Sequence, residues 1–243
     1  GAAAAGGGIN LYHSSPSLYD LTVSQNTVSG SGGGIWCYNH SNPTLKNSSV
    51  VNNSASVHGG GIRCWSNSNM KLENVVIANN YATEKGGGLH CRDSSPTLIS
   101  VTIINNTAGD VAGGIYLRDN CNPILNNSII WENTPQNIYF TTDNSPNNIT
   151  ITYSDLQGGQ DSIVTNDNGT VTWGDGNIDV DPRFIDFENS NYHLLASSML
   201  INAGHPDSTD SDGTRADIGA YPYLTDNTEP VWYINTAGND TTG

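Results

Sequence analysis

The sequence predicts an all-β solenoid, a parallel β-helix, and two observations carry this prediction. The first is a glycine triplet followed by a short apolar strand. Its third residue recurs at positions 8, 34, 61, 88 and 114, in steps of 26 or 27 residues. A fixed period in the twenties indicates a repeat architecture. The second is that each period holds several short β-prone segments joined by Gly, Asn and Pro turns, with no segment of helical length. Several strands in each period favour a β-helix over a leucine-rich horseshoe.

The strand after each triplet alternates between apolar and variable residues. Period-2 geometry then points the apolar residues inward and the residues between them outward. The expected inward residues are Ile9 and Leu11, Ile35 and Cys37, Ile62 and Cys64, Leu89 and Cys91, and Ile115 and Leu117.

Two polar positions recur at the ends of later strands. One holds Asn26, Asn53, Asn80, Asn106 and Asn133, and the other holds Asp20, Asn47, Asn74, Ser100 and Asn127. Stacked Asn side chains can hydrogen-bond to each other and to the backbone, and Asn tolerates the left-handed conformation. We interpret both rows as structural ladders at bends, not as metal sites.

After residue 133 the period loosens. Residues 138–140 and 149–153 have the composition of further strands, and residues 154–176 are expected to form a long loop or an irregular coil.

The pattern divides the chain into three parts. Residues 1–176 form the repeats, residues 177–223 a different, cap-like module, and residues 224–243 a linker or the first strand of a following domain or neighbouring subunit. The first five residues carry no capping signal, so we expect the first coil to be covered by something else or by a missing part of the chain.

The repeats and the last motif together resemble a known group of proteins. The residues that carry the resemblance are Gly32 to Cys37, Ser94 to Leu98, and the stretch from Asp212 to Tyr221, which reads DGTRADIGAY. Over most of residues 6–223 the chain is similar to secreted right-handed parallel β-helix proteins of the pectate-lyase-like class. The resemblance implies right-handed coils, a structural C-terminal module and an extracellular or cell-surface location. Its motifs are specific for the fold and weak for any activity.

The net charge of −15, from 23 acidic against 8 basic residues, excludes some partners. It argues against nucleic acid and anionic membranes. No apolar run is long enough for membrane insertion. The balance fits a secreted or surface-exposed protein, or one that binds cations.

Three of the four cysteines share one repeat position. They are Cys37, Cys64 and Cys91, and Cys121 is the fourth. Buried thiols that pack like small apolar residues are one interpretation. A bridge between neighbouring coils, such as Cys37 to Cys64, is the alternative.

The outward positions of the triplet strand are the first candidate site. Aromatic and guanidinium groups on a flat sheet suit sugar rings and acidic saccharides, although stacked aromatics also simply stabilise a sheet. The candidate ligand-binding residues are Trp36, Tyr38, Arg63, Trp65, His90, Arg92, Tyr116 and Arg118.

Asp93 and Asp119 are the second candidate. They follow Arg92 and Arg118 at one position of adjacent coils, so their Cα atoms should lie ~4.8 Å apart. Paired carboxylates can act as acid and base on a glycosidic bond or bind Ca²⁺. The flanking arginines favour the ionised form of both, which weakens the general-acid interpretation. A solvated row of ion pairs is the structural alternative.

The third candidate is a group of carboxylates near a Gly-containing loop. Clustered carboxylates suit Ca²⁺, although the spacing does not match an EF-hand loop. The members of the group are Asp207, Asp210, Asp212 and Asp217. We expect no required cofactor, and calcium is the one candidate.

Three functional hypotheses follow. The leading one is an extracellular structural or adhesive module that assembles end to end with itself or with neighbouring domains, because unpaired strand edges accept further strands. The rival is a polysaccharide lyase or glycoside hydrolase that uses Arg92, Asp93, Arg118 and Asp119. The third is polysaccharide binding without turnover on the outward face of the triplet strands.

Overall fold

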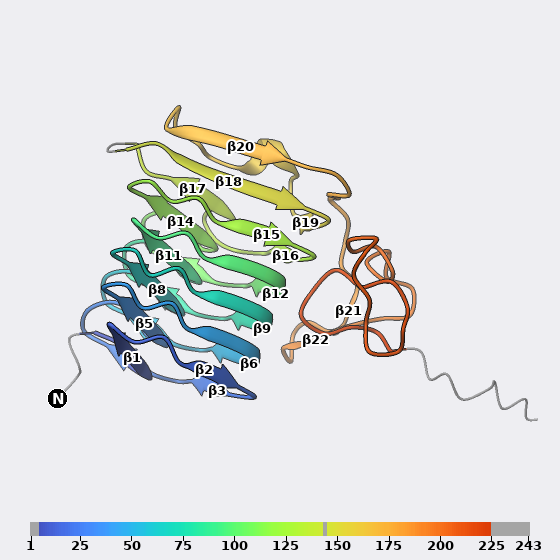
Figure 1. The fold of residues 1–243 in the computed structure, drawn as a ribbon, viewed down its shortest axis with the longest axis horizontal. Coiled ribbons are helices and arrows are strands. Elements are labelled where there is room, and N and C mark those ends of the chain that lie inside the picture. Colours follow the sequence, from blue (N-terminus) through green and yellow to red (C-terminus); the bar gives the residue numbers. More distant parts are fainter. Residues whose placement is uncertain (1–4, 143–144, 225–243) are drawn as a thin grey trace, which may run out of the picture.

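The computed structural model describes residues 5–142 and 145–224 and confirms the all-β fold. Successive coils stack in chain order into one column, and their strands pair in parallel (Figure 1). The irregular segment 154–176 forms a further coil, in which β20 (Gly169–Trp173) pairs with β18 (Asn147–Thr152). A single 3₁₀ turn at Gln160–Ser162 is the one helical element of the described residues, and none of their helices is long and apolar enough to span a membrane.

The coils contribute to three parallel sheets. The front sheet contains β1 (Ile9–Tyr12), β5 (Ile35–Tyr38), β8 (Ile62–Trp65), β11 (Leu89–Arg92), β14 (Ile115–Arg118) and β17 (Ile138–Phe140). The long sheet contains β2 (Ser17–Tyr19), β3 (Thr22–Ser24), β6 (Thr44–Val51), β9 (Lys71–Ala78), β12 (Thr97–Ile104), β15 (Ile124–Asn126), β16 (Ile129–Trp131), β18, β19 (Asp155–Leu156) and β20. The short sheet contains β4 (Thr27–Val28), β7 (Ser54–Ala55), β10 (Tyr81–Ala82) and β13 (Thr107–Ala108).

The inward side chains of the front sheet fill the core as predicted. Ile35 and Cys37 are fully buried, and their counterparts in the next three coils are fully buried too. All four cysteines are buried free thiols, which favours the first interpretation of the cysteine column. Removal from water disfavours the thiolate, so burial raises the pKa of Cys91, and it raises that of Cys121 to about 12.

The glycine triplets let neighbouring coils approach closely. A Cβ atom on Gly33 would lie 2.3 Å from the carbonyl oxygen of Gly60 in the next coil. Gly32 has φ of +70°, a conformation that other residues adopt at a cost. The triplet is therefore a requirement of coil packing.

The predicted asparagine ladder is confirmed and is almost completely buried. Asn80 shows the pattern: its Oδ1 accepts hydrogen bonds from the backbone N–H and the side-chain Nδ2 of Asn53, both at 3.0 Å. Its Nδ2 donates to the carbonyl oxygen of Val50 and to Oδ1 of Asn106. The same two hydrogen bonds join Asn26 to Asn53 at the start of the row and Asn106 to Asn133 at its end.

The second predicted row also lies at a bend. All five of its residues have φ between 49° and 54°, the left-handed region that Asn and Asp tolerate. Asn74 Nδ2 donates to Asn47 Oδ1, and Asn127 Oδ1 accepts from the backbone of His205. This row therefore also connects the coils to the C-terminal module.

The C-terminal module lies against the side of the coils, next to the long sheet (Figure 1). It contains one antiparallel pair, β21 (Phe184–Asp186) and β22 (Asn191–Leu194). Tyr192 packs against the outer surface of β9 and β12, and Ala220 N donates to Thr102 Oγ1 at 3.0 Å. The module thus covers the flank of the solenoid, a position that its cap-like sequence did not reveal. Of the predicted tail 224–243, all but Leu224 lies outside the described residues.

The packing of the module explains a departure from alternation in two strands. Val76, Ala78 and Ile104 point outward from the core yet are buried, because the module covers them. The long sheet is therefore apolar on both faces where the module docks.

Candidate functional site

The outer face of the front sheet gathers the predicted ligand-binding residues in two rows. Parallel pairing holds them in register, so each side chain lies over the equivalent one in the next coil. One row contains Asn10, Trp36, Arg63, His90, Tyr116 and Tyr139, and the other contains Tyr12, Tyr38, Trp65, Arg92 and Arg118. We call these two rows, with His58 and Lys85 from the preceding turns, the aromatic–cation face.

At the N-terminal end of this face, aromatic rings alternate with guanidinium groups. Trp36 and Trp65 are stacked with their planes 8° apart and their centroids 6.4 Å apart. Arg63 Cζ lies 4.9 Å from the Trp65 centroid, and Arg92 Cζ lies 5.3 Å from the same ring. These distances are those of cation–π contacts, so part of each ring face is already used within the protein.

A second stack continues toward the C-terminal coils. His58 and His90 are stacked with centroids 4.7 Å apart, and His90 stacks on Tyr116 at 4.9 Å. Lys85 Nζ lies 5.5 Å from the ring of Tyr116, which in turn stacks on Tyr139.

His58, Lys85 and Tyr139 were not among the candidate residues predicted from the sequence. His58 and Lys85 occupy one repeat position immediately before the glycine triplet, and this shared position is the signal that could have identified them. Tyr139 follows the loosening of the period, which hid its place in the row.

The two rows differ in exposure. Arg63, His90 and Tyr116 are nearly buried, at 9%, 2% and 1% exposure. The second row is more open: Tyr12 is 63% exposed, and the side chains of Arg92 and Arg118 are about one third exposed. Cross-coil packing therefore dominates the first row, and the second row is the accessible edge.

This face holds four of the eight basic residues of a strongly acidic protein, and the carboxylates of Asp119 and Glu84 lie beside them. Burial is the main cause that lowers the pKa of Arg63 to about 10, and the charges of Arg92 and Arg118 add to it. Burial and the nearby cations Arg63 and Lys85 also lower the pKa of His58 to about 4, and burial likewise keeps the pKa of His90 well below its usual range. Both imidazoles are thus neutral at pH 7, and the positive charge is carried by the arginines and Lys85.

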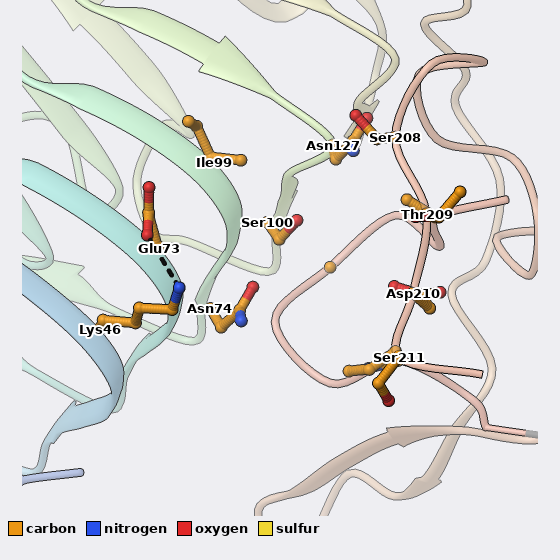
Figure 2. A pocket seen from close by; sticks show the side chains of 13 residues that line it. Lys46, Glu73, Asn74, Ile99, Ser100, Asn127, Ser208, Thr209, Asp210 and Ser211 are labelled. Atoms are coloured by element: carbon orange, nitrogen blue, oxygen red, sulfur yellow. Dashed lines mark ion pairs between the residues drawn. The ribbon is translucent and has the colours of Figure 1, made fainter. Parts of the chain in front are cut away.

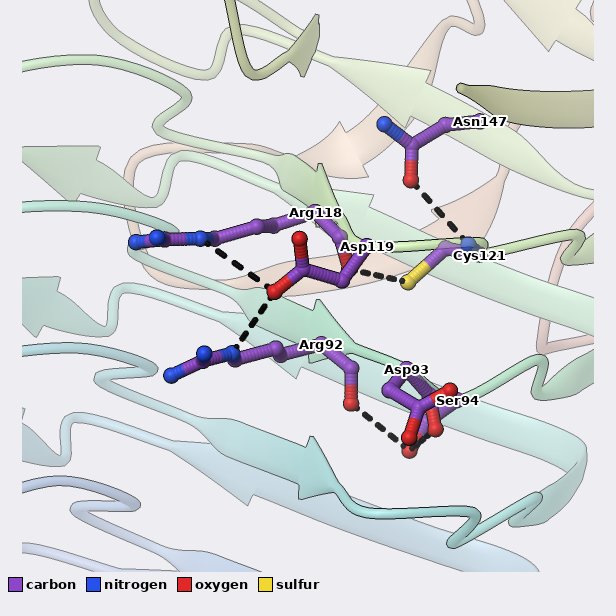
Figure 3. A network of polar contacts seen from close by, with 7 residues as sticks. All are labelled: Arg92, Asp93, Ser94, Arg118, Asp119, Cys121 and Asn147. Atoms are coloured by element: carbon purple, nitrogen blue, oxygen red, sulfur yellow. Dashed lines mark hydrogen bonds and ion pairs between the residues drawn. The ribbon is translucent and has the colours of Figure 1, made fainter. Parts of the chain in front are cut away.

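The two predicted carboxylates have different surroundings. Figure 3 shows Asp119 directed between two guanidinium groups: its Oδ2 accepts a hydrogen bond from Arg92 Nε at 2.8 Å and lies 3.5 Å from Arg118 Nε. Asp93 lies beside Ser94 and forms no ion pair within the described residues. One oxygen of Asp119 is therefore already engaged by protein, and the acid–base role of the pair stays a prediction.

The four predicted calcium ligands lie in the C-terminal module. Within the described residues, no three His, Cys, Asp or Glu side chains form a group that could hold a metal ion. Asp210 Oδ2 accepts from the backbone of Asp217, and Asp212 Oδ1 accepts from Thr214. Burial raises the pKa of Asp210 to about 6, and the neighbouring carboxylates add to this shift. The calcium site stays a prediction.

Asp210 also lines a polar cavity of about 370 Å³ between the module and the long sheet (Figure 2). On the opposite wall, Lys46 Nζ lies 3.3 Å from Glu73 Oε2. Asn74, Ser100 and Asn127, three members of the second polar row, also line it. Ile99, Ala216 and Pro222 supply the apolar part of its lining, and no aromatic side chain lines it.

The comparison with protein families identifies the fold. A family model described as "Right handed beta helix region" matches residues 7–185. The chain belongs to the right-handed β-helix family. No curated protein and no solved structure matches it.

Membership in the right-handed β-helix family accounts for the coils and their stacking, and confirms the fold part of the resemblance. The match ends at residue 185, within the C-terminal module. It assigns no ligand or reaction, so any function must be argued from the variable outward positions.

Proposed function

We propose that this β-helix is a polysaccharide-binding module of an extracellular structural or adhesive protein. An extended acidic polysaccharide would lie along the aromatic–cation face, parallel to the axis of the solenoid. The observation that carries the proposal is a charge asymmetry. Four of the eight basic residues, Arg63, Lys85, Arg92 and Arg118, gather with stacked aromatics on one face of a protein with net charge −15.

The geometry supports a long ligand over a small one. The rows cross consecutive coils at the regular spacing of a parallel sheet, which presents a repeated set of groups to a repeated polymer. Guanidinium groups recognise carboxylates with two parallel hydrogen bonds, and a sugar ring that carries a carboxylate could contact both the arginines and the exposed ring of Tyr12. Charge attraction would speed encounter and make binding sensitive to salt.

Binding without turnover is the version that the carboxylate geometry favours. A glycosidase needs two carboxylates free to act on one bond, and Asp119 is already engaged by Arg92 and Arg118. Turnover by a polysaccharide lyase or glycoside hydrolase is the alternative. It predicts product from an acidic polysaccharide that disappears in both Asp93→Ala and Asp119→Ala.

Affinity electrophoresis tests the binding proposal. Migration of the full chain should be retarded in gels that contain polygalacturonate or alginate, and not in gels that contain neutral dextran. Trp65→Ala and Arg92→Ala should each weaken retention by about tenfold, the effect of losing roughly 1.4 kcal/mol. Lys71→Ala is the matched control, because it removes a positive charge from the long sheet, next to Glu73. Equal retention of all four proteins would contradict a site on this face.

End-to-end assembly remains a second candidate, and one observation favours it. Ile9, Leu11 and Leu18 of the first coil are only partly buried, whereas Ile35 and Leu45 in the second coil are fully buried. The sheets of the first described coil also pair on one side only. A further coil, from a second copy or from a neighbouring domain, would pair with these edges and bury these side chains. Sedimentation of the full chain should then show concentration-dependent oligomers that Leu11→Glu abolishes, and a monomer at every concentration would count against assembly.

A further inference from the structure

The docking of the C-terminal module against the coils creates a second cavity, of about 560 Å³, where the end of β16 meets the segment around β21. This cavity lies on the long sheet and shares no residue with the aromatic–cation face. We propose that it binds one neutral sugar ring, such as the terminal residue of a glycan, independently of any acidic polysaccharide. Its size falls within the range of ordinary ligand pockets.

The apolar part of the wall consists of three aromatic residues, one leucine and Pro182. Trp131 comes from the solenoid, and Phe184, Phe187 and Leu195 come from the module. The two phenylalanine rings are held from behind by buried Tyr192, whose centroid lies 5.5 Å from one ring and 6.3 Å from the other, both edge to face. The rings are therefore fixed before any ligand arrives, which lowers the entropy cost of binding.

The indole of Trp131 is unusually open for its position. It pairs in register with Ile104, which pairs with Ala78, and both of those residues are fully buried beneath the module. Trp131 packs against both apolar clusters of the module and is only partly buried, because part of its side chain lines the cavity. An apolar ring face is thus left available at the point where the module ends.

The same cavity is lined by charged groups of both signs. Glu132, Asp181 and Arg183 contribute to its wall, and none of them has an ion-pair partner within the described residues. Asp181 Oδ1 accepts from the backbone of Arg183, and Glu132 Oε1 accepts from Gln157 Nε2. Each carboxylate keeps a second oxygen, and the guanidinium keeps most of its donors.

The apolar part and the charged part of the wall together determine which ligand fits the cavity. A wholly apolar ligand would remove the three charges from water without giving them partners, which is costly. An anionic ligand would meet two carboxylates, and a cation would meet the guanidinium. A neutral ring with one apolar face and a rim of hydroxyls satisfies both walls, since hydroxyls both donate and accept hydrogen bonds. Such a ligand is a pyranose.

Proton–nitrogen correlation spectra of the full chain test the inference, with methyl β-glucoside, methyl β-galactoside and N-acetylglucosamine as probes. Trp131→Phe identifies the indole signal of Trp131. At least one probe should shift this signal saturably and leave the indole signals of Trp36 and Trp65 unmoved. Arg183→Ala and Phe187→Ala should each weaken the affinity for that probe about tenfold. Ile185→Ala is the control, because this β21 residue is 51% exposed and does not line the cavity.

Absence of any shift at tens of millimolar of all three probes would overturn the inference. A shift that Arg183→Ala and Phe187→Ala leave unchanged would also overturn it. Retention of the Arg183→Ala variant on polygalacturonate is expected to match the wild type, so failure here and failure of the proposed function are distinguishable.

Discussion

The asparagine ladder predicts that one amide in the middle of the row stabilises the solenoid far more than the amide at its first described coil. The perturbation is Asn80→Ala, compared with Asn26→Ala. Asn80 is 1% exposed, and its amide makes four hydrogen bonds to two neighbouring coils. Asn26 is only partly buried, and its side chain donates to Ser24 and to Asn53.

The magnitude follows from which groups lose their partners. In Asn80→Ala the buried backbone N–H of Asn53 is left without an acceptor, which costs about 1–3 kcal/mol. Loss of the two donated bonds, to Val50 and Asn106, adds about 1 kcal/mol each. The total of about 3–5 kcal/mol is a large fraction of the ~5–15 kcal/mol typical of a folded domain. In Asn26→Ala no backbone N–H of the described residues loses an acceptor. Only the two donated bonds are lost, at a site partly open to water, and we expect about 1–2 kcal/mol.

Equilibrium unfolding in urea, followed by far-ultraviolet circular dichroism and by tryptophan fluorescence, measures both free energies. Asn80→Asp serves as a second variant. It keeps the acceptor for Asn53 but cannot donate to Asn106, so it should also destabilise. A loss below about 1 kcal/mol for Asn80→Ala, or equal losses at the two positions, would refute the account of the ladder.

Three further predictions concern other parts of the molecule. The pKa of His58 is about 4 in the folded state, below its ordinary value of 6.5. Between pH 6.5 and pH 4 the unfolded chain therefore binds more protons than the folded chain, and the free energy of unfolding decreases as the pH falls through this range. In His58→Asn the free energy of unfolding should fall by about 1–2 kcal/mol less over this pH range than in the wild type, after a discount for partial exposure. Cys91 should react with a thiol reagent only at the rate of unfolding, so labelling in native buffer would contradict its burial. Tyr192→Ala removes a side chain that is 3% exposed between the module and the coils. Proteolysis should then cut within 177–224 while the coils survive, and an unchanged cleavage pattern would show that the contact is unimportant.

The coils could be predicted from the sequence because their cause is local and periodic. Alternation alone placed Ile35 and Cys37 inward, and the regular recurrence of one Asn at a bend predicted the ladder. The left-handed residues at that bend are not the ladder asparagines but the residues immediately before them, Gln25, Asn52, Asn79, Asn105 and Glu132. The site could be predicted only in part. Trp65 and Arg92 were placed on one face by register, but their contact depends on side-chain rotamers, which spacing does not determine.

Other features depend on contacts between distant segments. The carboxylate of Asp119 turns toward Arg92 of the previous coil, although sequence spacing suggested a pair with Asp93. The flank position of the module could have been inferred from Val76 and Ile104, where alternation fails because both faces are covered. The cavity at Trp131 had no sequence signal, since its walls come from residues about fifty positions apart.

The central claim is that the aromatic–cation face binds an acidic polysaccharide. Isothermal titration calorimetry of the full chain with polygalacturonate, at low and at high salt, tests it most directly. We expect binding at low salt that weakens as salt is added, that is reduced in Arg118→Ala, and that is absent for neutral dextran. Binding that ignores salt and Arg118→Ala, or no binding at low salt, would contradict it.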